Sequence, residues 1–134
     1  MADQPRDALP TFFLLSVAFN VDSLVLVLGD GADRPLLEVS FSPPRAFRCY
    51  AESDYWHYLN AFTGAALVGT THAGCGIELS TDAPYLLDYR AHAREQEPEE
   101  TFSCLVRTPD HCVEVICFES PRLRFLYGPQ STLS

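Results

Sequence analysis

The chain has 134 residues, the length of a single domain. Its composition, 47% hydrophobic and 20% charged, is that of a globular protein and excludes an intrinsically disordered one. The formal net charge of −9 argues against nucleic acid and anionic membrane surfaces as partners, because like charges repel.

The first part of the chain predicts extended structure. Residues 1–10 contain two prolines and no periodicity, so we expect a flexible N-terminal tail followed by one domain over 11–134. In one segment Leu37, Val39 and Phe41 alternate with polar residues, which indicates a strand with one buried face. The segments with apolar or alternating patterns, each expected to be a strand, are 11–19, 24–28, 36–41 and 46–50.

Two helices are expected. The first covers residues 53–62, where Ser53 can cap the N-terminus. Its apolar stripe consists of Tyr55, Leu59 and Phe62. The second covers about residues 83–93 and has Pro84 in its first turn.

The clearest local pattern is a β-hairpin of residues 101–107 and 112–118. A turn centred on Pro109 and Asp110 places Leu105 opposite Glu114, and Arg107 diagonal to Glu114. The side chains expected to face the core are Phe102, Cys104, Val106, Val113, Val115 and Cys117.

Short strands at 65–68, 77–79 and 123–127 complete the pattern. The fold class predicted is α+β, with an antiparallel, twisted or partly closed sheet of about six to eight strands and two helices.

The cysteines and the apolar runs both indicate the cytoplasm. Five cysteines cannot pair completely, and thiols stay reduced in the cytosol. No apolar run reaches the roughly 18 residues of a membrane-spanning helix, and the start does not have the pattern of a signal peptide. Three of the cysteines, Cys49, Cys104 and Cys117, are expected in the core, since a thiol behaves as a small apolar group.

One loop could carry thiol chemistry. Cys75 lies in the segment Gly69–Gly76, three positions after His72, and a Cys–His pair can lower the pKa of a thiol. A small-molecule-binding protein or thiol-dependent enzyme that uses this loop is therefore an alternative. The sequence has no C-x-x-C pair, phosphate loop, dinucleotide motif or serine-nucleophile elbow, so we expect no metal and no cofactor.

The first helix suggests a different kind of site. Its residues 55–58 read Tyr-Trp-His-Tyr, and a helix cannot turn four consecutive side chains inward. Trp56 or Tyr58 is then at least partly exposed, unless a neighbouring loop buries Trp56. Tyrosine and tryptophan dominate protein interfaces, and with Glu52 and Asp54 beside them the surface suits a basic partner.

The order of these segments resembles that of small bacterial immunity-type proteins linked to polymorphic toxin systems. The resemblance covers residues 36–125 and implies an antiparallel sheet with helices, and binding instead of catalysis. The segments that carry it are Arg45-Ala46-Phe47-Arg48, Glu52-Ser53-Asp54-Tyr55-Trp56, Ser80, Tyr85-Leu86, residues 102–107, Asp110-His111-Cys112-Val113-Glu114-Val115-Ile116, and Pro121.

We therefore expect a non-catalytic protein-binding module, an immunity protein that neutralises a cognate toxin. The expected partner is a basic toxin domain, bound through Glu52, Asp54, Trp56 and Tyr58, with no catalytic or metal-binding residues. A structural, homo-oligomeric protein is a further alternative, suggested by the apolar strands near the N-terminus.

Overall fold

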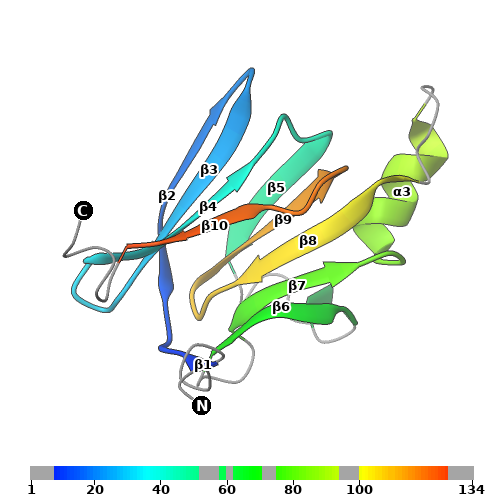
Figure 1. Ribbon diagram of the computed structural model, residues 1–134. Helices are drawn as coiled ribbons and strands as arrows, with labels where there is room; N and C mark the ends of the chain where they lie inside the picture. Colours follow the sequence, from blue (N-terminus) through cyan, green and yellow to red (C-terminus); the bar gives the residue numbers. More distant parts are fainter. Residues whose placement is uncertain (1–7, 52–57, 60–61, 71–74, 94–99, 127–134) are drawn as a thin grey trace, which may run out of the picture.

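The computed structural model describes residues 8–51, 58–59, 62–70, 75–93 and 100–126 (Figure 1). These residues form two β-sheets, one of six strands and one of four, together with one complete helix. No helix in this part of the chain is long and apolar enough to cross a membrane.

The four-stranded sheet has the order β10-β4-β3-β2, and all neighbouring strands are antiparallel. The three strands that come first in the sequence, β2, β3 and β4, lie where the apolar and alternating patterns predict them. Its strands are β2 (Phe13–Asn20), β3 (Ser23–Gly29), β4 (Pro35–Phe41) and β10 (Arg122–Phe125).

The six-stranded sheet has the order β1-β6-β7-β8-β9-β5. Five of its strands form an antiparallel set, and the sixth, β1, pairs in parallel with β6. The two-residue β1 lies inside residues 1–10, the segment expected to be a tail. The bounds are β1 (Ala8–Leu9), β5 (Ala46–Ala51), β6 (Ala65–Thr70), β7 (Gly76–Ser80), β8 (Phe102–Arg107) and β9 (His111–Cys117).

The hairpin of β8 and β9 has the register that its turn predicts. Leu105 lies opposite Glu114, and Arg107 lies opposite Cys112. The two core-facing sets also agree with the prediction, since alternate side chains of both strands enter the core between the sheets.

The two sheets pack face to face around a first hydrophobic core. β3 and β4 contribute alternate residues, which include the predicted Leu37, Val39 and Phe41. From the other sheet come residues of β7, β8 and β9, such as Val106 and Val115. The period of two in these strands places one face of each sheet in this core.

A second core lies on the opposite face of the six-stranded sheet. Here α3 (Pro84–His92) covers the sheet, on the side away from the four-stranded sheet (Figure 1). Leu86 of α3 packs with Leu105 and Ile116 of the sheet and with Leu59 and Phe62. The six-stranded sheet is therefore the middle layer of the described residues, and its strands β8 and β9 are buried on both faces.

The α+β class is confirmed, but one detail of the prediction is wrong. The described residues form two sheets with ten strands in all, instead of one sheet of about six to eight. One of the two expected helices is described completely. That helix, α3, begins at Pro84 as predicted. The other, predicted over residues 53–62, falls mainly outside the described residues, among which Tyr58 and Leu59 are helical.

Candidate functional site

A buried carboxylate lies on the face of the six-stranded sheet that α3 covers, next to the edge strand β5. Glu114 lies on β9 between Val113 and Val115, which both face the first core. The alternation of the strand therefore turns Glu114 toward the second core, where the residue is 0% exposed. Burial of a charged group is costly unless the group is paired and hydrogen-bonded.

Three side chains satisfy Glu114. Arg48 lies directly opposite on β5, and its Nη2 is 3.3 Å from Oε1 of the carboxylate. The hydroxyl of Tyr58 donates to Oε2 at 2.9 Å, and the hydroxyl of Ser103 on β8 donates to the same oxygen. The charge is thus matched by one cation, and both oxygens have donors.

The Arg48 guanidinium lies in a tyrosine cage, formed by Tyr50, Tyr58 and Tyr85. Its central carbon is 4.0 Å from the ring centroid of Tyr85, 4.8 Å from that of Tyr58 and 5.5 Å from that of Tyr50. Aromatic faces attract a guanidinium through their negative quadrupole. The side chain of Arg48 remains 28% exposed, so this cage has an opening to solvent.

Burial and the nearby charge keep these tyrosines neutral. Burial raises the pKa of Tyr58 to about 12, and the Glu114 carboxylate acts in the same direction. Burial also raises the pKa of Tyr50 and of Tyr85. Burial acts to lower the pKa of Arg48, but Glu114 and the tyrosines shift this pKa upward on balance. At neutral pH the tyrosine hydroxyls around the ion pair of Arg48 and Glu114 therefore stay protonated.

Tyr58 also links the cluster to the helix. Its hydroxyl oxygen accepts a hydrogen bond of 3.2 Å from the backbone N–H of Tyr85, in the first turn of α3. The first N–H groups of a helix have no partner within the helix, so this hydroxyl satisfies one of them. Through one side chain, residue 58 is joined both to the start of α3 and to β9 of the six-stranded sheet.

A second ion pair lies on the same face of the sheet. Nη2 of Arg107 is 3.3 Å from Oε1 of Glu78 on β7, and it donates at 3.5 Å to the carbonyl oxygen of Phe62. The hairpin register does place Arg107 diagonal to Glu114, as predicted, but their ion-pair partners are Glu78 and Arg48.

Of the sequence-predicted partner-binding residues, the structure describes Tyr58 alone. Glu52, Asp54 and Trp56 lie outside the described residues. Tyr58 is half-buried, packs against the second core and directs its hydroxyl into the sheet. Its hydroxyl is therefore part of the buried cluster, as a hydrogen-bond donor to Glu114.

The cysteines are mostly buried. Cys75, the candidate thiol, is 8% exposed in the first core, and its Sγ donates to the carbonyl oxygen of Phe12 at 3.7 Å, while His72 lies outside the described residues. Cys104 and Cys117 lie in the same core as expected. Burial raises the pKa of Cys104 well above its ordinary value, and that of Cys117 to about 12.

Cys49 does not follow the expectation of a core cysteine, because it is exposed. It lies on β5, an edge strand of the six-stranded sheet. Among the described residues, no three or more histidine, cysteine, aspartate or glutamate side chains are grouped so that they could hold a metal ion.

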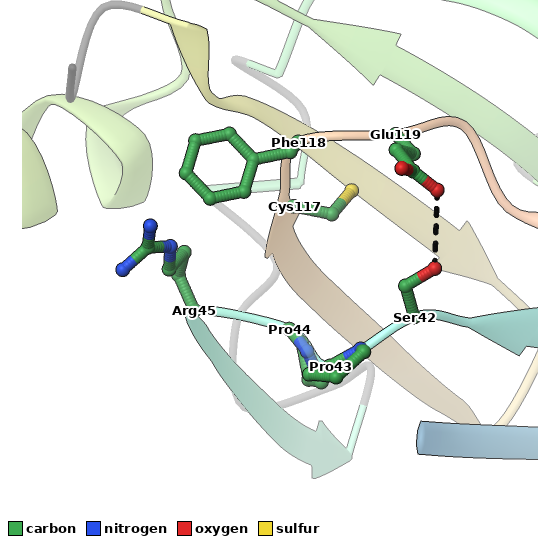
Figure 2. A pocket seen from close by; sticks show the side chains of 7 residues that line it. All are labelled: Ser42, Pro43, Pro44, Arg45, Cys117, Phe118 and Glu119. Atoms are coloured by element: carbon green, nitrogen blue, oxygen red, sulfur yellow. Dashed lines mark hydrogen bonds between the residues drawn. The ribbon is translucent and has the colours of Figure 1, made fainter. Parts of the chain in front are cut away.

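A hollow of about 400 Å³ lies between the loop that joins β4 to β5 and the chain that follows β9 (Figure 2). On one side the Arg45 guanidinium lies 4.2 Å from the ring centroid of Phe118. On the other side Ser42 donates to Glu119 at 3.1 Å, and Cys117 lies between this pair and the side of Arg45 and Phe118 (Figure 2). The high pKa of Cys117 means that this hollow offers no thiolate at neutral pH.

Comparison with known proteins finds no match: no protein-family model fits the sequence, and no curated protein and no solved structure is significantly similar to it. The functional argument therefore depends on the residues and their geometry.

Proposed function

We propose that the chain is a non-catalytic protein-binding module that uses Glu52, Asp54 and Trp56, together with the outer part of Tyr58, to hold its partner. In its more specific form, the proposal is an immunity protein that neutralises a toxin. The observation that carries the proposal is the double hydrogen bonding of the Tyr58 hydroxyl, to Glu114 and to the first turn of α3.

The anchored residue, Tyr58, comes shortly after the other proposed binding residues in the sequence. Trp56 is two positions before Tyr58, and the two acidic residues are four and six positions before it. A rigid anchor at the end of a binding segment reduces the conformational entropy that is lost when a partner binds. The cluster of Glu114, Arg48 and Tyr58 is thus suited to position this segment.

The chemistry of the segment defines the partner. Tryptophan and tyrosine supply large apolar contact areas at protein interfaces. The carboxylates of Glu52 and Asp54, in a protein of net charge −9, attract a positively charged surface and increase the rate of association. A basic toxin domain fits both features, and the resemblance to immunity-type proteins points to the same class.

The proposal is tested by finding the partner and then measuring its affinity. A photo-crosslinking amino acid at position 56 captures a neighbouring protein in the cell of origin, and mass spectrometry identifies it. Titration calorimetry with the purified partner then compares the wild-type chain with Trp56→Ala and with Asp54→Asn. We expect the first change to weaken binding about thirtyfold or more, since a central tryptophan contributes roughly 2 to 4 kcal/mol.

Leu87→Ala is the matched control, because Leu87 is an exposed apolar residue of α3. It should leave the affinity unchanged, and all variants should keep the melting temperature of the wild type. Equal affinity of the wild type and Trp56→Ala for the captured protein would rule out this site. Neutralisation of that protein's toxicity by the wild-type chain, but not by Trp56→Ala, tests the more specific proposal.

A further inference from the structure

The hollow beside Cys117 has a basic side chain at one side and an acidic one at the other (Figure 2). Arg45 supplies the first and Glu119 the second, and Cys117 lies between the two sides (Figure 2). The volume of about 400 Å³ is within the range of sites that bind small molecules. The hollow therefore has the size of a small-molecule site and can attract both signs of charge.

The guanidinium of Arg45 is held by an aromatic ring and not by a carboxylate. It lies over the ring of Phe118, 4.2 Å from the ring centroid, while the backbone N–H of Arg45 donates to the carbonyl oxygen of Ile116 at 2.8 Å. A guanidinium that lies over a ring keeps the N–H groups in its own plane available. Arg45 can therefore bind a carboxylate through two parallel hydrogen bonds.

The lack of a carboxylate partner distinguishes Arg45 from other arginines of this acidic chain. Across the part of the chain that the structure describes, its guanidinium forms no ion pair and no hydrogen bond. Four other arginines each form an ion pair with an aspartate or glutamate, namely Arg34, Arg48, Arg107 and Arg124. The donors of Arg45 are thus available to a ligand in the hollow.

The opposite side of the hollow offers an acceptor. The hydroxyl of Ser42 donates to Oε1 of Glu119 at 3.1 Å, and both residues are exposed. This bond orients the carboxyl group, while its second oxygen, Oε2, accepts no hydrogen bond from any described residue. An ammonium group, which carries three N–H donors, can therefore bind at this oxygen.

The surface between the two sides is apolar. Cys117 is buried, and its Sγ donates to the backbone carbonyl oxygens of Phe102 and Val115, so its hydrogen is not directed to a ligand. Pro43 and Pro44 line the hollow as well, and proline has no backbone N–H to donate. A methylene chain thus suits the middle of the hollow, with polar groups at its two ends.

We propose that the hollow binds a short zwitterionic molecule of the ω-amino carboxylate class, with a carboxylate at one end and an ammonium group at the other. Arg45 holds the carboxylate, Glu119 holds the ammonium group, and the methylene chain lies along Cys117 and the two prolines. A molecule with only one of the two charged groups gains one of these interactions. The site does not depend on the protein-binding function proposed above.

The probe is ε-aminocaproate, which is titrated into the isotope-labelled full chain while heteronuclear NMR spectra are recorded. We expect saturable shifts of the backbone amides that line the hollow, those of Ser42, Arg45, Phe118 and Glu119. Caproate lacks the ammonium group and n-hexylamine lacks the carboxylate, so each should bind about tenfold more weakly. Glycine, whose two charged groups share one carbon atom, should cause no saturable shifts, because it cannot reach both sides.

Two substitutions test the two ends of the site. Arg45→Gln and Glu119→Gln should each weaken the binding of ε-aminocaproate about tenfold, since each removes one charged partner. Arg124→Gln makes the same change at an exposed arginine on β10 and should leave the affinity unchanged. Circular dichroism verifies that the three variants are folded.

The wild-type chain alone is sufficient to overturn the proposal. Absence of saturable shifts at the hollow would do so, and so would equal binding of ε-aminocaproate, caproate and n-hexylamine, because the two charged ends would then not select the ligand. Unchanged affinity in Arg45→Gln or in Glu119→Gln would overturn it as well.

Discussion

The hydroxyl of Tyr58 donates to Oε2 of Glu114 at 2.9 Å, and so joins two residues 56 positions apart in the sequence. The same oxygen of Tyr58 accepts the N–H of Tyr85. This one hydroxyl connects the sheet, the first turn of α3 and the chain that follows the proposed binding residues. Its removal should therefore affect both stability and binding.

Tyr58→Phe should lower the free energy of unfolding by about 2 kcal/mol, since it removes one hydrogen bond to a buried charge and one to a helix N–H. Urea denaturation measures this loss. Tyr89→Phe is the control, because Tyr89 also packs against the second core but does not bond to Glu114. Equal stability of the two variants would show that the Tyr58 hydroxyl contributes nothing of its own.

Glu114→Gln should be more damaging, with a loss of roughly 3 kcal/mol, because Arg48 then keeps its charge in a partly buried site without a counter-charge. Replacing both residues by apolar ones, Arg48→Met with Glu114→Leu, should cost less than the two single changes Arg48→Met and Glu114→Leu added together. A double-mutant cycle measured in urea quantifies this coupling. Strict additivity would mean that the ion pair has no energetic role.

Stability should fall at high pH in a defined window. The ordinary pKa of tyrosine is 10.0, and that of Tyr58 in the folded protein is about 12. Below pH 10 the residue is protonated in both states, and its contribution to stability is complete. Between pH 10 and pH 12 the unfolded chain loses the proton first, so the free energy of unfolding decreases.

Urea denaturation at several pH values within this window, for the wild type and for Tyr58→Phe, isolates the contribution of Tyr58. Tyr50 and Tyr85 also have a raised pKa and act in the same direction in both proteins. The decrease should be smaller in the variant. Identical pH profiles would contradict the assignment of a raised pKa to Tyr58.

The sequence predicted the hairpin of β8 and β9 with its register because both signals there are local. The turn at Pro109 and Asp110 fixes the pairing, and the alternation of the strands fixes which side chains face the first core. The arrangement of strands into two sheets was not predictable in this way. Strands show the same alternation whether they belong to one sheet or to two. Whether one sheet or two sheets form depends on contacts between segments that are distant in the sequence.

The buried cluster was missed for a related reason. Glu114 alternates with valines, a pattern that usually marks a strand with one solvated face. The second core covers that face, so the carboxylate is buried. A signal was present in Arg48, which is flanked by apolar residues on a predicted strand, but its pairing with Glu114 depends on the placement of β5 beside β9.

Thiol reactivity tests the alternative function assigned to the Gly69–Gly76 loop. Cys75 is buried, whereas Cys49 is exposed. Iodoacetamide treatment of the folded protein, followed by mass spectrometry of its peptides, should label Cys49 first and leave Cys75 largely unmodified. Labelling of Cys75 faster than an unhindered cysteine would instead favour a reactive thiol in this loop.

The central claim is that the chain presents Trp56 to a partner, and its single tryptophan makes this directly measurable. The emission of the free protein should resemble that of tryptophan in water, and acrylamide should quench it efficiently. Addition of the captured partner should shift the emission to shorter wavelength and reduce its quenching by acrylamide. A blue-shifted emission that acrylamide cannot quench in the free protein would show that Trp56 is enclosed, and would contradict the account.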